Sequence, residues 1–569
     1  MATQYSSLRS LSAAVSWIFV CIAALLICVA AYKNISYPLL WNDESETAMT
    51  ARQVLKYGYP KVHDGKHTIF IADNPLWLGY KKSYDANISI PWGNYYFGAI
   101  GVWLAGTTVD IYRQTALVRL PYTTIALIGL MMFGLAMRRF FTRSLSFRLF
   151  FAVFLLLEML SVNMLVHIRE ARYYSLVIFI CACYFYLFAT FHFHRNYSKA
   201  KYLLLLSILL LLAYNVNAIA YGAMALTTGL YQIYAWCQYR FGRRNAVFRF
   251  DMKESIWLIS PLIFTAILII PELNFFETLR MAALANAYYH NSTGKMLMNL
   301  KEIFHVMCDF DLLYAFAIIW VIRVSCTLLI HRAAISGDER IIKLKGISLF
   351  MSLFFAVFIL IAARMPFLFS RYFIVLQPVL ILMLLTDMLI AIEYIKYLDR
   401  PRVLTAVGVL YSCICLVNIA AIDNHISDYL GQMFTPYRGP LDFYIPALQK
   451  RFPNPGGIVI ATNYEELSFE YYLGCQVILG YKNQFQEYNE EELGKYSPDV
   501  LIIRPASAFD KRPYEYYMTH GRFQKVTFPV KDWPVNNMAD LDLFVRHQFK
   551  TLATDIEDEK AKMYLRTSP

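Results

Sequence analysis

Charged side chains are scarce in this chain. Asp, Glu, Lys and Arg account for 17% of its 569 residues, whereas soluble globular domains carry about 25%. Hydrophobic residues reach 58%, and the mean hydropathy is +0.41. This balance excludes an ordinary water-soluble domain, because so much apolar surface requires lipid as its solvent.

Motifs of several other protein classes are also missing. The chain has no Walker sequence, no GxGxxG, no internal repeat and no low-complexity tract. Its ten cysteines lie mostly within apolar runs, so we interpret them as small core residues rather than as disulfides or metal ligands. The first apolar run, Leu11 to Tyr32, is long enough to span a bilayer and lacks a small-residue cleavage site, which predicts a retained signal anchor.

Long apolar runs recur along the first three quarters of the chain. Segments of roughly 17 to 25 apolar residues can cross a bilayer as helices, and about eleven such segments are present. We expect them at residues 13–32, 114–137, 149–166, 173–191, 202–219, 221–237, 254–271, 312–329, 346–363, 372–391 and 403–422. The fold class predicted is therefore a polytopic α-helical membrane protein.

Lys and Arg are concentrated in alternate loops. Residues 138–148, 192–201, 239–253, 331–345 and 393–402 are rich in them and fall on one side of the membrane. The positive-inside rule explains the formal charge of +12 better than binding to nucleic acid does. It predicts a cytoplasmic N-terminus, with the first loop and the C-terminus on the outer face.

Two segments outside the spans have a distinctive pattern. Within the first outer loop (33–113), residues 91–106 are apolar but short and rich in Gly and Trp, which predicts an interfacial or re-entrant helix. After the membrane domain at 1–422, short β-like runs alternate with helix-like stretches such as Tyr464–Leu473, which predicts an outward-facing α/β domain at 423–569. The β-like runs lie at 457–461, 475–480, 500–503, 524–530 and 543–547.

The segment Trp41 to Pro60 brings three acids, Asp43, Glu44 and Glu46, to the outer membrane surface. A helix-like stretch follows and is expected to end at Gly58. One interpretation is structural: Asn42 or Asp43 caps the helix and Glu46 completes a capping box. The other interpretation is catalytic.

The catalytic interpretation comes from a resemblance. WNDESETAMTARQVLKYGYP, followed by PWGNYYFGAIGVWLAG and by Arg119 and Pro121, resembles the first outer loop and second span of GT-C glycosyltransferases. The group most similar is that of the protein mannosyltransferases and aminoarabinose transferases (glycosyltransferase family 39 and relatives). HIREARYYSL (167–176) and SRYFIVLQP (370–378) resemble later outer turns of that family.

The resemblance implies an inverting transfer of a monosaccharide from a polyprenyl-phosphate donor to a lipid, glycan or protein acceptor. Asp43 and Glu44 match the family's acidic pair, and Asp43 is the expected base. The expected contacts of the donor phosphate are Arg371, Tyr372, Arg169 and Arg172. Ile90 stands where relatives have a lysine, so Lys81 and Lys82 are the nearest substitutes.

Structural interpretations of the same residues remain open. Arginines at a membrane edge commonly anchor a helix to lipid headgroups. Glu170, a possible second acid, lies between Arg169 and Arg172 and is expected to be an ion-pair partner rather than a catalyst.

No metal or other cofactor is expected to be required. His63 and His67 have the spacing of zinc ligands on a helix, but Gly65 between them predicts a turn. Asp309 and Asp311 are possible ligands of a divalent cation, although the group resembled does not use one. They end an outer loop at 272–311 that is expected either to close over the substrates or only to connect two spans.

Two other functions are compatible with the composition. A transporter would carry ionisable residues at mid-membrane depth and often has two related halves, whereas the notable charges here are expected at the outer ends of the spans. A non-catalytic relative acting as a scaffold is the other alternative. The expected location is a bacterial inner membrane, with the endoplasmic reticulum as the alternative. The expected partners are the lipid-linked donor, membrane lipids and a lipid, glycan or protein acceptor.

Overall fold

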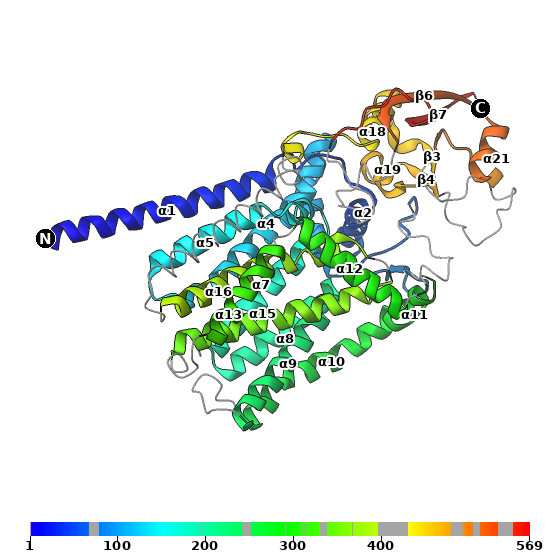
Figure 1. The fold of residues 1–569 in the computed structure, drawn as a ribbon. Coiled ribbons are helices and arrows are strands. Elements are labelled where there is room, and N and C mark those ends of the chain that lie inside the picture. Colours follow the sequence, from blue (N-terminus) through cyan, green and yellow to red (C-terminus); the bar gives the residue numbers. More distant parts are fainter. Residues whose placement is uncertain are drawn as a thin grey trace.

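The computed structural model describes residues 2–67, 79–194, 196–241, 252–288, 290, 292–310, 313–329, 338–366, 368–396, 431–479, 493–504, 512–532 and 550–568. Long helices form one bundle, and a β-sheet with its own short helices lies at one end of it (Figure 1). The bundle and the sheet are therefore distinct layers of the molecule, as the change of composition along the sequence predicts.

Seven helices in the described part of the chain have the length and hydropathy needed to cross a membrane. They are α1 (Ala2–Tyr32), α4 (Ile111–Ala136), α7 (Tyr174–His192), α8 (Lys199–Val216), α10 (Met252–Phe275), α15 (Glu339–Ala363) and α16 (Leu376–Lys396). Large apolar side chains such as Ile18, Leu25 and Ile263 point outward from them. Lipid covers such surfaces, so the chain is an integral membrane protein.

Three further helices lie where spans are predicted: α5 (Ser144–Met159), α9 (Ala218–Phe241) and α13 (Leu313–Leu329). The prediction of one continuous helix at 149–166 is wrong. Ser161 has an extended backbone (φ −81°, ψ 91°), and its hydroxyl bonds to Gln377, so α5 ends before it and a short α6 (Val162–His167) follows. The predicted span at 403–422 lies outside the described residues.

One ion pair lies in the middle of the bundle. Arg323 of α13 donates to Asp387 of α16 at 2.6 Å and to Ser348 of α15 at 2.8 Å. The expectation that the notable charges sit only at the outer ends of the spans is therefore wrong. Sequence could not show this pair because its members are 64 residues apart.

The first loop folds into α2 (Asn42–Tyr57), a small hairpin of β1 (Tyr80–Lys81) and β2 (Ala86–Asn87), and α3 (Gly93–Ala105). As predicted, α2 ends at Gly58, which adopts the left-handed conformation (φ 82°) that closes a helix. α3 packs between α2 and α4. A side chain at Gly101 would lie 2.5 Å from the carbonyl oxygen of Val118, so only glycine permits this close contact.

The predicted loop at 272–311 is largely helical. It contains α11 (Thr278–Tyr288) and α12 (Thr293–Phe310). Asn299 of α12 donates to the carbonyl oxygens of Ala363 and Met365 at 3.0 and 3.1 Å, which anchors α12 to the end of α15. Short 3-10 turns, η1 (Arg138–Phe140) and η3 (Ser370–Phe373), flank the bundle helices.

The C-terminal part contains a five-stranded sheet of order β4-β3-β5-β7-β6. β3 (Val459–Thr462), β4 (Gln476–Leu479) and β5 (Val500–Ile502) are parallel, and β6 (Arg522–Lys531) and β7 (Lys560–Ser568) are antiparallel. The helices and turn around it are α18 (Leu441–Arg451), η4 (Pro455–Gly457), α19 (Glu466–Leu473) and α21 (Arg512–His520). The predicted α/β class of this part is confirmed, and β7 is an additional strand that the sequence does not predict. The predicted strand at 543–547 and the predicted domain boundary at 422 lie outside the described residues.

A buried arginine fixes the start of α19. Arg504 is fully buried and is ion-paired with Glu465 and Asp532. Glu465 immediately precedes α19, so this ion pair holds the helix against the sheet.

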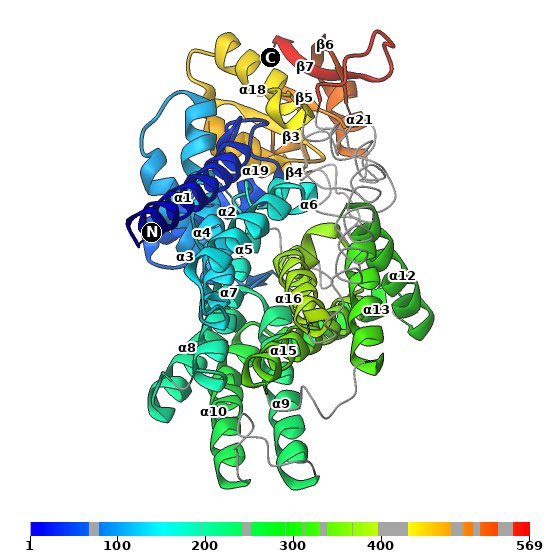
Figure 2. The same ribbon diagram turned by 60° about the vertical axis from the view of Figure 1, so that its left-hand side comes forward.

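Helix α19 packs directly on α2 (Figure 2). The hydroxyls of Ser468 of α19 and Ser45 of α2 lie 2.9 Å apart, and each lies 3.0 Å from the carbonyl oxygen of Leu40, so the three groups share two hydrogen-bond donors. The hydroxyl of Tyr472 accepts from the backbone N–H of Leu40 at 2.9 Å. The five-stranded sheet and its helices, between Leu441 and Ser568 (the sheet domain), are thus hydrogen-bonded to α2 and the residues just before it. Helix α2 carries the three acids of the acidic motif.

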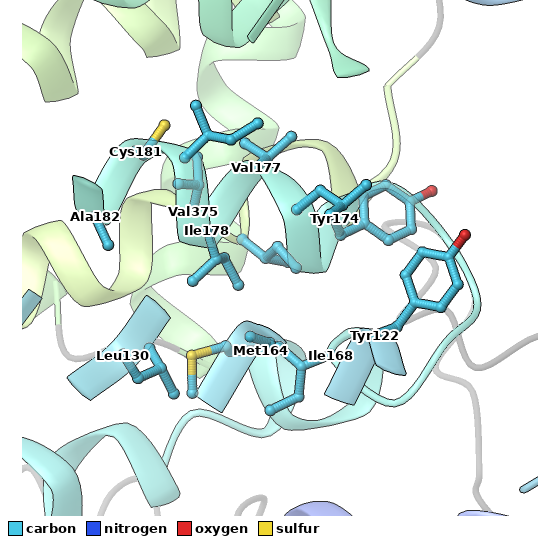
Figure 3. Close-up of a cluster of buried hydrophobic side chains, with 14 of the residues drawn as sticks. Tyr122, Leu130, Met164, Ile168, Tyr174, Val177, Ile178, Cys181, Ala182 and Val375 are labelled. Carbon is cyan, nitrogen blue, oxygen red and sulfur yellow. The ribbon is translucent and has the colours of Figure 1, made fainter. Parts of the chain in front are cut away.

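Helices α4 and α7 enclose a dense apolar cluster next to the turn at 168–173 (Figure 3). Tyr122 and Leu130 of α4 lie on one side of it, and Ile178 of α7 lies on the other (Figure 3). Ile168 of the turn itself is also buried in this core. Packing of this kind fixes the turn that carries the predicted arginines.

Asp442, at the start of α18, is a buried carboxylate between the sheet domain and the first loop. Its Oδ2 accepts from the backbone N–H of Gly439 at 2.9 Å, and the backbone of Leu39 and the hydroxyl of Tyr112 also donate to the carboxylate. Burial outweighs these bonds and raises the pKa of Asp442 from 3.8 to about 7.

The folded protein therefore holds a proton at Asp442 that the unfolded chain releases. This contribution to stability is complete below the unfolded pKa and is lost as the pH rises through about 7. We predict that Asp442→Asn unfolds at a higher temperature than the native chain at pH 8, and that the difference narrows as the pH falls to about 5. Thermal unfolding in detergent measures this, with the exposed Asp558→Asn as control. A difference that does not change with pH would contradict the prediction.

Candidate active site

The first turns of α2 present three acids in three different environments. Trp41 occupies the N-cap with an extended backbone, and no side chain caps the helix. The predicted capping box is therefore wrong. Glu46 instead accepts from the hydroxyl of Tyr95 at 2.6 Å, so α2 is joined to α3 at this position.

Glu44 forms a buried bidentate ion pair with Arg119 of α4. Nε of Arg119 donates to Oε1 at 2.8 Å, and Nη2 donates to Oε2. The backbone N–H of Ala171 donates to the same Oε1 at 2.8 Å. Arg119 also donates to the carbonyl oxygens of Ile35 and Pro38. These bonds join α2, α4 and the 168–173 turn at a single carboxylate.

Asp43 is the accessible acid of the three. Its side chain is 25% exposed, against 17% for Glu46 and 0% for Glu44. Its Oδ2 lies 3.4 Å from Nη2 of Arg172 and 3.5 Å from Nη2 of Arg371. Two buried guanidinium groups therefore lie next to one partly exposed carboxylate.

Arg172 is oriented by α2. Its Nη1 donates to the carbonyl oxygen of Asp43 at 2.9 Å and to the hydroxyl of Thr47 at 3.2 Å, and it lies 3.4 Å from Oε2 of Glu46. Burial opposes the charge of this arginine. The carboxylates of Asp43 and Glu46 outweigh that effect and raise its pKa well above the usual value, so Arg172 is a permanent cation.

Arg371 is oriented by aromatic rings. It lies on η3, and its guanidinium carbon is 4.1 Å from the ring centre of Phe369 and 5.1 Å from that of Trp41. A flat guanidinium can stack on these rings, whereas an ammonium group makes only the cation–π contact. Tyr372 follows it, and burial raises the pKa of that phenol, so it stays protonated.

The sheet domain also contributes a side chain near Asp43, that of Tyr464. Tyr464 directly precedes the Glu465 that pairs with Arg504, and burial together with the charges of Glu465 and Asp43 raises its pKa. The contacts of Ser468 and Tyr472 with Leu40 hold α19 beside the start of α2, which places Tyr464 within the electrostatic influence of Asp43.

Other predicted site residues have different partners. Nη2 of Arg169 donates to the carbonyl oxygen of Lys33 at 2.6 Å, beside a small cavity of about 30 Å³ that Arg119 also lines. Lys81 donates to the carbonyl oxygen of Phe275 at 3.1 Å, and Lys82 is exposed on the following turn. Within the described part of the chain, the side-chain ion pairs of Asp43 are with Arg172 and Arg371.

Glu170 is paired as the sequence suggested, but with a different partner. Its Oε2 lies 3.4 Å from Nδ1 of His167, and both side chains are buried. Burial raises the pKa of Glu170, and His167 partly offsets this rise. Its expected pairing with the neighbouring arginines is therefore replaced by a pair with histidine on the preceding turn of chain.

The two histidines of the first loop point to separate carboxylates. Nδ1 of His63 lies 2.6 Å from Asp85, whereas Nδ1 of His67 lies 3.0 Å from Asp64. Gly65 between them has φ 91°, as a turn requires. Among the residues described, no group of three or more potential ligands is placed to hold a metal ion. The side chains of Asp309 and Asp311 lie outside that set.

Sequence reasoning missed Tyr95, Trp41 and the contacts from α19. Tyr95 lies in the aromatic-rich stretch that marked α3, but nothing in the stretch indicates which tyrosine reaches Glu46. Arg119 was noted as part of the resemblance, and its pairing with Glu44 became visible only in three dimensions.

The Glu44–Arg119 pair gives a stability prediction. Removing one partner of a buried ion pair leaves an uncompensated charge and costs about 3–5 kcal/mol. We predict that Glu44→Gln and Arg119→Gln each destabilise the fold by about that amount, and that the double variant loses clearly less than the two losses combined. Unfolding in mixed detergent micelles measures all three. Glu339→Gln, which removes an exposed partner of Lys343, is the matched control and should change little. Strict additivity would show that the pair does not act as a unit.

Of three comparisons with known proteins, only the comparison with solved structures gives a match, and that match concerns the fold. No protein-family model and no curated protein sequence matches the chain. Among solved structures, the apo state of ArnT from Cupriavidus metallidurans is similar, with 12% identity and a TM-score of 0.50 over 97% of this chain and 98% of that chain. ArnT bound to undecaprenyl phosphate gives 11% identity and a TM-score of 0.49 over 96% of this chain and 97% of that chain. ArnT is an aminoarabinose transferase of the GT-C superfamily. The chain therefore shares the overall fold of apo ArnT, in agreement with the fold that its motifs predicted.

Proposed function

We propose that this chain transfers a monosaccharide from a polyprenyl-phosphate donor to an acceptor hydroxyl or amine outside the membrane. The observation that carries the proposal is the partly exposed carboxylate of Asp43 between two buried arginines, at the end of a helical bundle that resembles GT-C enzymes. A base and a cationic phosphate site are the two groups that this reaction needs, and here they are adjacent.

Asp43 is the proposed base. In the transfer, an acceptor oxygen or nitrogen bonds to the anomeric carbon and gives its proton to Asp43, while the bond from that carbon to the phosphate oxygen breaks. The lipid phosphate leaves with the electron pair. Because attack and departure occur on opposite faces of the sugar, the configuration at the anomeric carbon inverts. Phosphate is a good leaving group, so the reaction needs no general acid.

Arg172 and Arg371 are the proposed phosphate ligands. Their distances to Asp43, 3.4 and 3.5 Å, exceed the 2.7–2.9 Å or so of a tight charged hydrogen bond. Nε of Arg172 is buried and has no hydrogen-bond partner among the described residues. A bound phosphate would supply the missing acceptor, and the two cations would stabilise the charge that grows on it.

Glu44 and Arg119 have a different proposed role. The carboxylate of Glu44 and the guanidinium of Arg119 bond to each other and to backbone groups, so neither side chain is available to a substrate. We propose that they position Asp43 and the 168–173 turn. Glu170 pairs with His167 in this scheme. Arg169 and Lys81 make contacts elsewhere and Lys82 is exposed, so direct binding of the reacting phosphate is assigned to the two arginines beside Asp43.

The proposed orientation follows the charges of the loops. The N-terminus would lie in the cytoplasm of a bacterial cell, and the Asp43 cluster and the sheet domain on the outer side of the inner membrane. The donor lipid would then enter from the bilayer with its phosphate at the level of Asp43. Acceptors of the cell envelope, such as a lipid, glycan or protein, are reached on that side.

Transport is a second candidate because of the Arg323–Asp387 pair. Ionisable residues inside a membrane bundle commonly mark a transport path. In this chain the pair is tight and is joined to Ser348, which is equally expected of a structural link between α13, α15 and α16.

We predict that Asp43→Asn lowers the rate of sugar transfer by about 10²- to 10⁴-fold at equal protein abundance, the usual contribution of a general base. Membranes containing the native chain or the variant would be given radiolabelled undecaprenyl-phosphate sugars and candidate acceptors. Asp558→Asn, which removes an exposed acid of the sheet domain, is the control and should leave the rate unchanged. Equal transfer by the native chain and Asp43→Asn would exclude Asp43 as the base.

We also predict that Arg371→Lys raises the KM for the donor by about tenfold, since one to two kcal/mol of stacking and paired hydrogen bonding is lost. Arg169→Lys should leave this KM nearly unchanged. If Arg169→Lys raises the KM and Arg371→Lys does not, the phosphate lies on the other side of the Glu44–Arg119 pair.

A further inference from the structure

A second hollow lies at the opposite end of the bundle from Asp43. A cavity of about 550 Å³ opens between the first half of α5 and the last half of α16. Figure 1 shows this end of the two helices on the side of the N-terminus, with the sheet domain at the far end. The cavity is thus separate from the proposed transfer site.

The walls of the cavity are apolar. Leu149 and Val153 lie one helical turn apart on α5, and Leu385 and Leu389 lie one turn apart on α16. The side chains of Leu149 and Val153 are 45% and 36% exposed. The cavity therefore opens on the surface that faces lipid rather than toward a polar interior.

The mouth of the cavity is cationic. Arg143 stands at the N-cap of α5, is exposed, and makes no side-chain hydrogen bond or ion pair within the described part of the chain. Arg340 donates to Glu393 at 2.9 Å and to the carbonyl oxygen of Phe140 at 3.1 Å. Two arginines and one glutamate leave a net positive charge, to which the N-terminus of α5 adds. The hydroxyl-bearing Ser146 also lines this mouth.

We propose that this cavity holds an anionic glycerophospholipid of the leaflet opposite Asp43. The headgroup phosphate binds Arg143 and the start of α5, and an acyl chain lies along the leucines of α5 and α16. The apolar walls select a lipid over a soluble anion, and the net charge selects an anionic headgroup over a zwitterionic one. The position at the far end of the bundle distinguishes this lipid from the sugar donor.

The test measures lipid binding to the purified full chain by native mass spectrometry. The probes are phosphatidylglycerol and phosphatidylcholine with identical acyl chains. Arg143→Gln removes an unpaired cation at the mouth, and Leu149→Trp places a bulky ring in the wall of the cavity and obstructs it. Arg113→Gln, which removes an exposed arginine at the other end of the bundle, is the matched control. Thermal unfolding confirms that each variant is folded.

We expect the native chain to prefer phosphatidylglycerol. Arg143→Gln should weaken that binding about fivefold, the effect of one basic residue near an anionic lipid, with little change for phosphatidylcholine. Leu149→Trp should weaken both lipids, Arg143→Lys should restore the preference, and Arg113→Gln should have no effect. Equal affinity for the two lipids, unchanged binding in Arg143→Gln or Leu149→Trp, or displacement by millimolar inorganic phosphate alone would overturn the proposal.

Discussion

The bidentate pair between Glu44 and Arg119 is the constraint on which the arrangement around Asp43 depends. It joins the first turn of α2 to α4, and the backbone N–H of Ala171 brings the 168–173 turn to the same carboxylate. Asp43 and Arg172 stand next to these anchored positions in sequence. Their separation is therefore fixed by an interaction in which neither takes part. A buried pair tolerates the loss of neither partner, so this geometry is held rigidly.

The sheet domain adds a second restraint on the same helix. Ser468 and Tyr472 bond to Ser45 and to the backbone at Leu40, on either side of the acidic motif. The Arg504 cluster holds α19 in the position that these bonds require. In the proposed reaction the base must stay within reach of the acceptor while the phosphate leaves. Two independent sets of buried polar contacts on α2 provide that preorganisation.

Much of the fold could be predicted from sequence because lipid imposes simple rules. Apolar runs of spanning length placed the bundle helices, Gly58 marked the end of α2, and the change of composition marked the α/β part. The site was less accessible. Asp43 and Glu44 are adjacent and chemically alike. Only tertiary contacts leave the carboxylate of Asp43 partly exposed and bury that of Glu44 among hydrogen-bond donors. The Arg323–Asp387 pair and the contact of Tyr95 with Glu46 were missed for the same reason, since neither follows from local pattern. The break at Ser161 was missed because the apolar pattern continues through it.

A structure of the protein with a bound polyprenyl phosphate would show whether a lipid-linked phosphate binds between Arg172 and Arg371 beside Asp43. We expect phosphate oxygens within about 2.7–3.0 Å of both guanidinium groups, with the site of the sugar next to Oδ2 of Asp43. A phosphate bound instead at Arg169, or at Lys81 and Lys82, with Arg172 and Arg371 still closed on Asp43, would contradict this expectation.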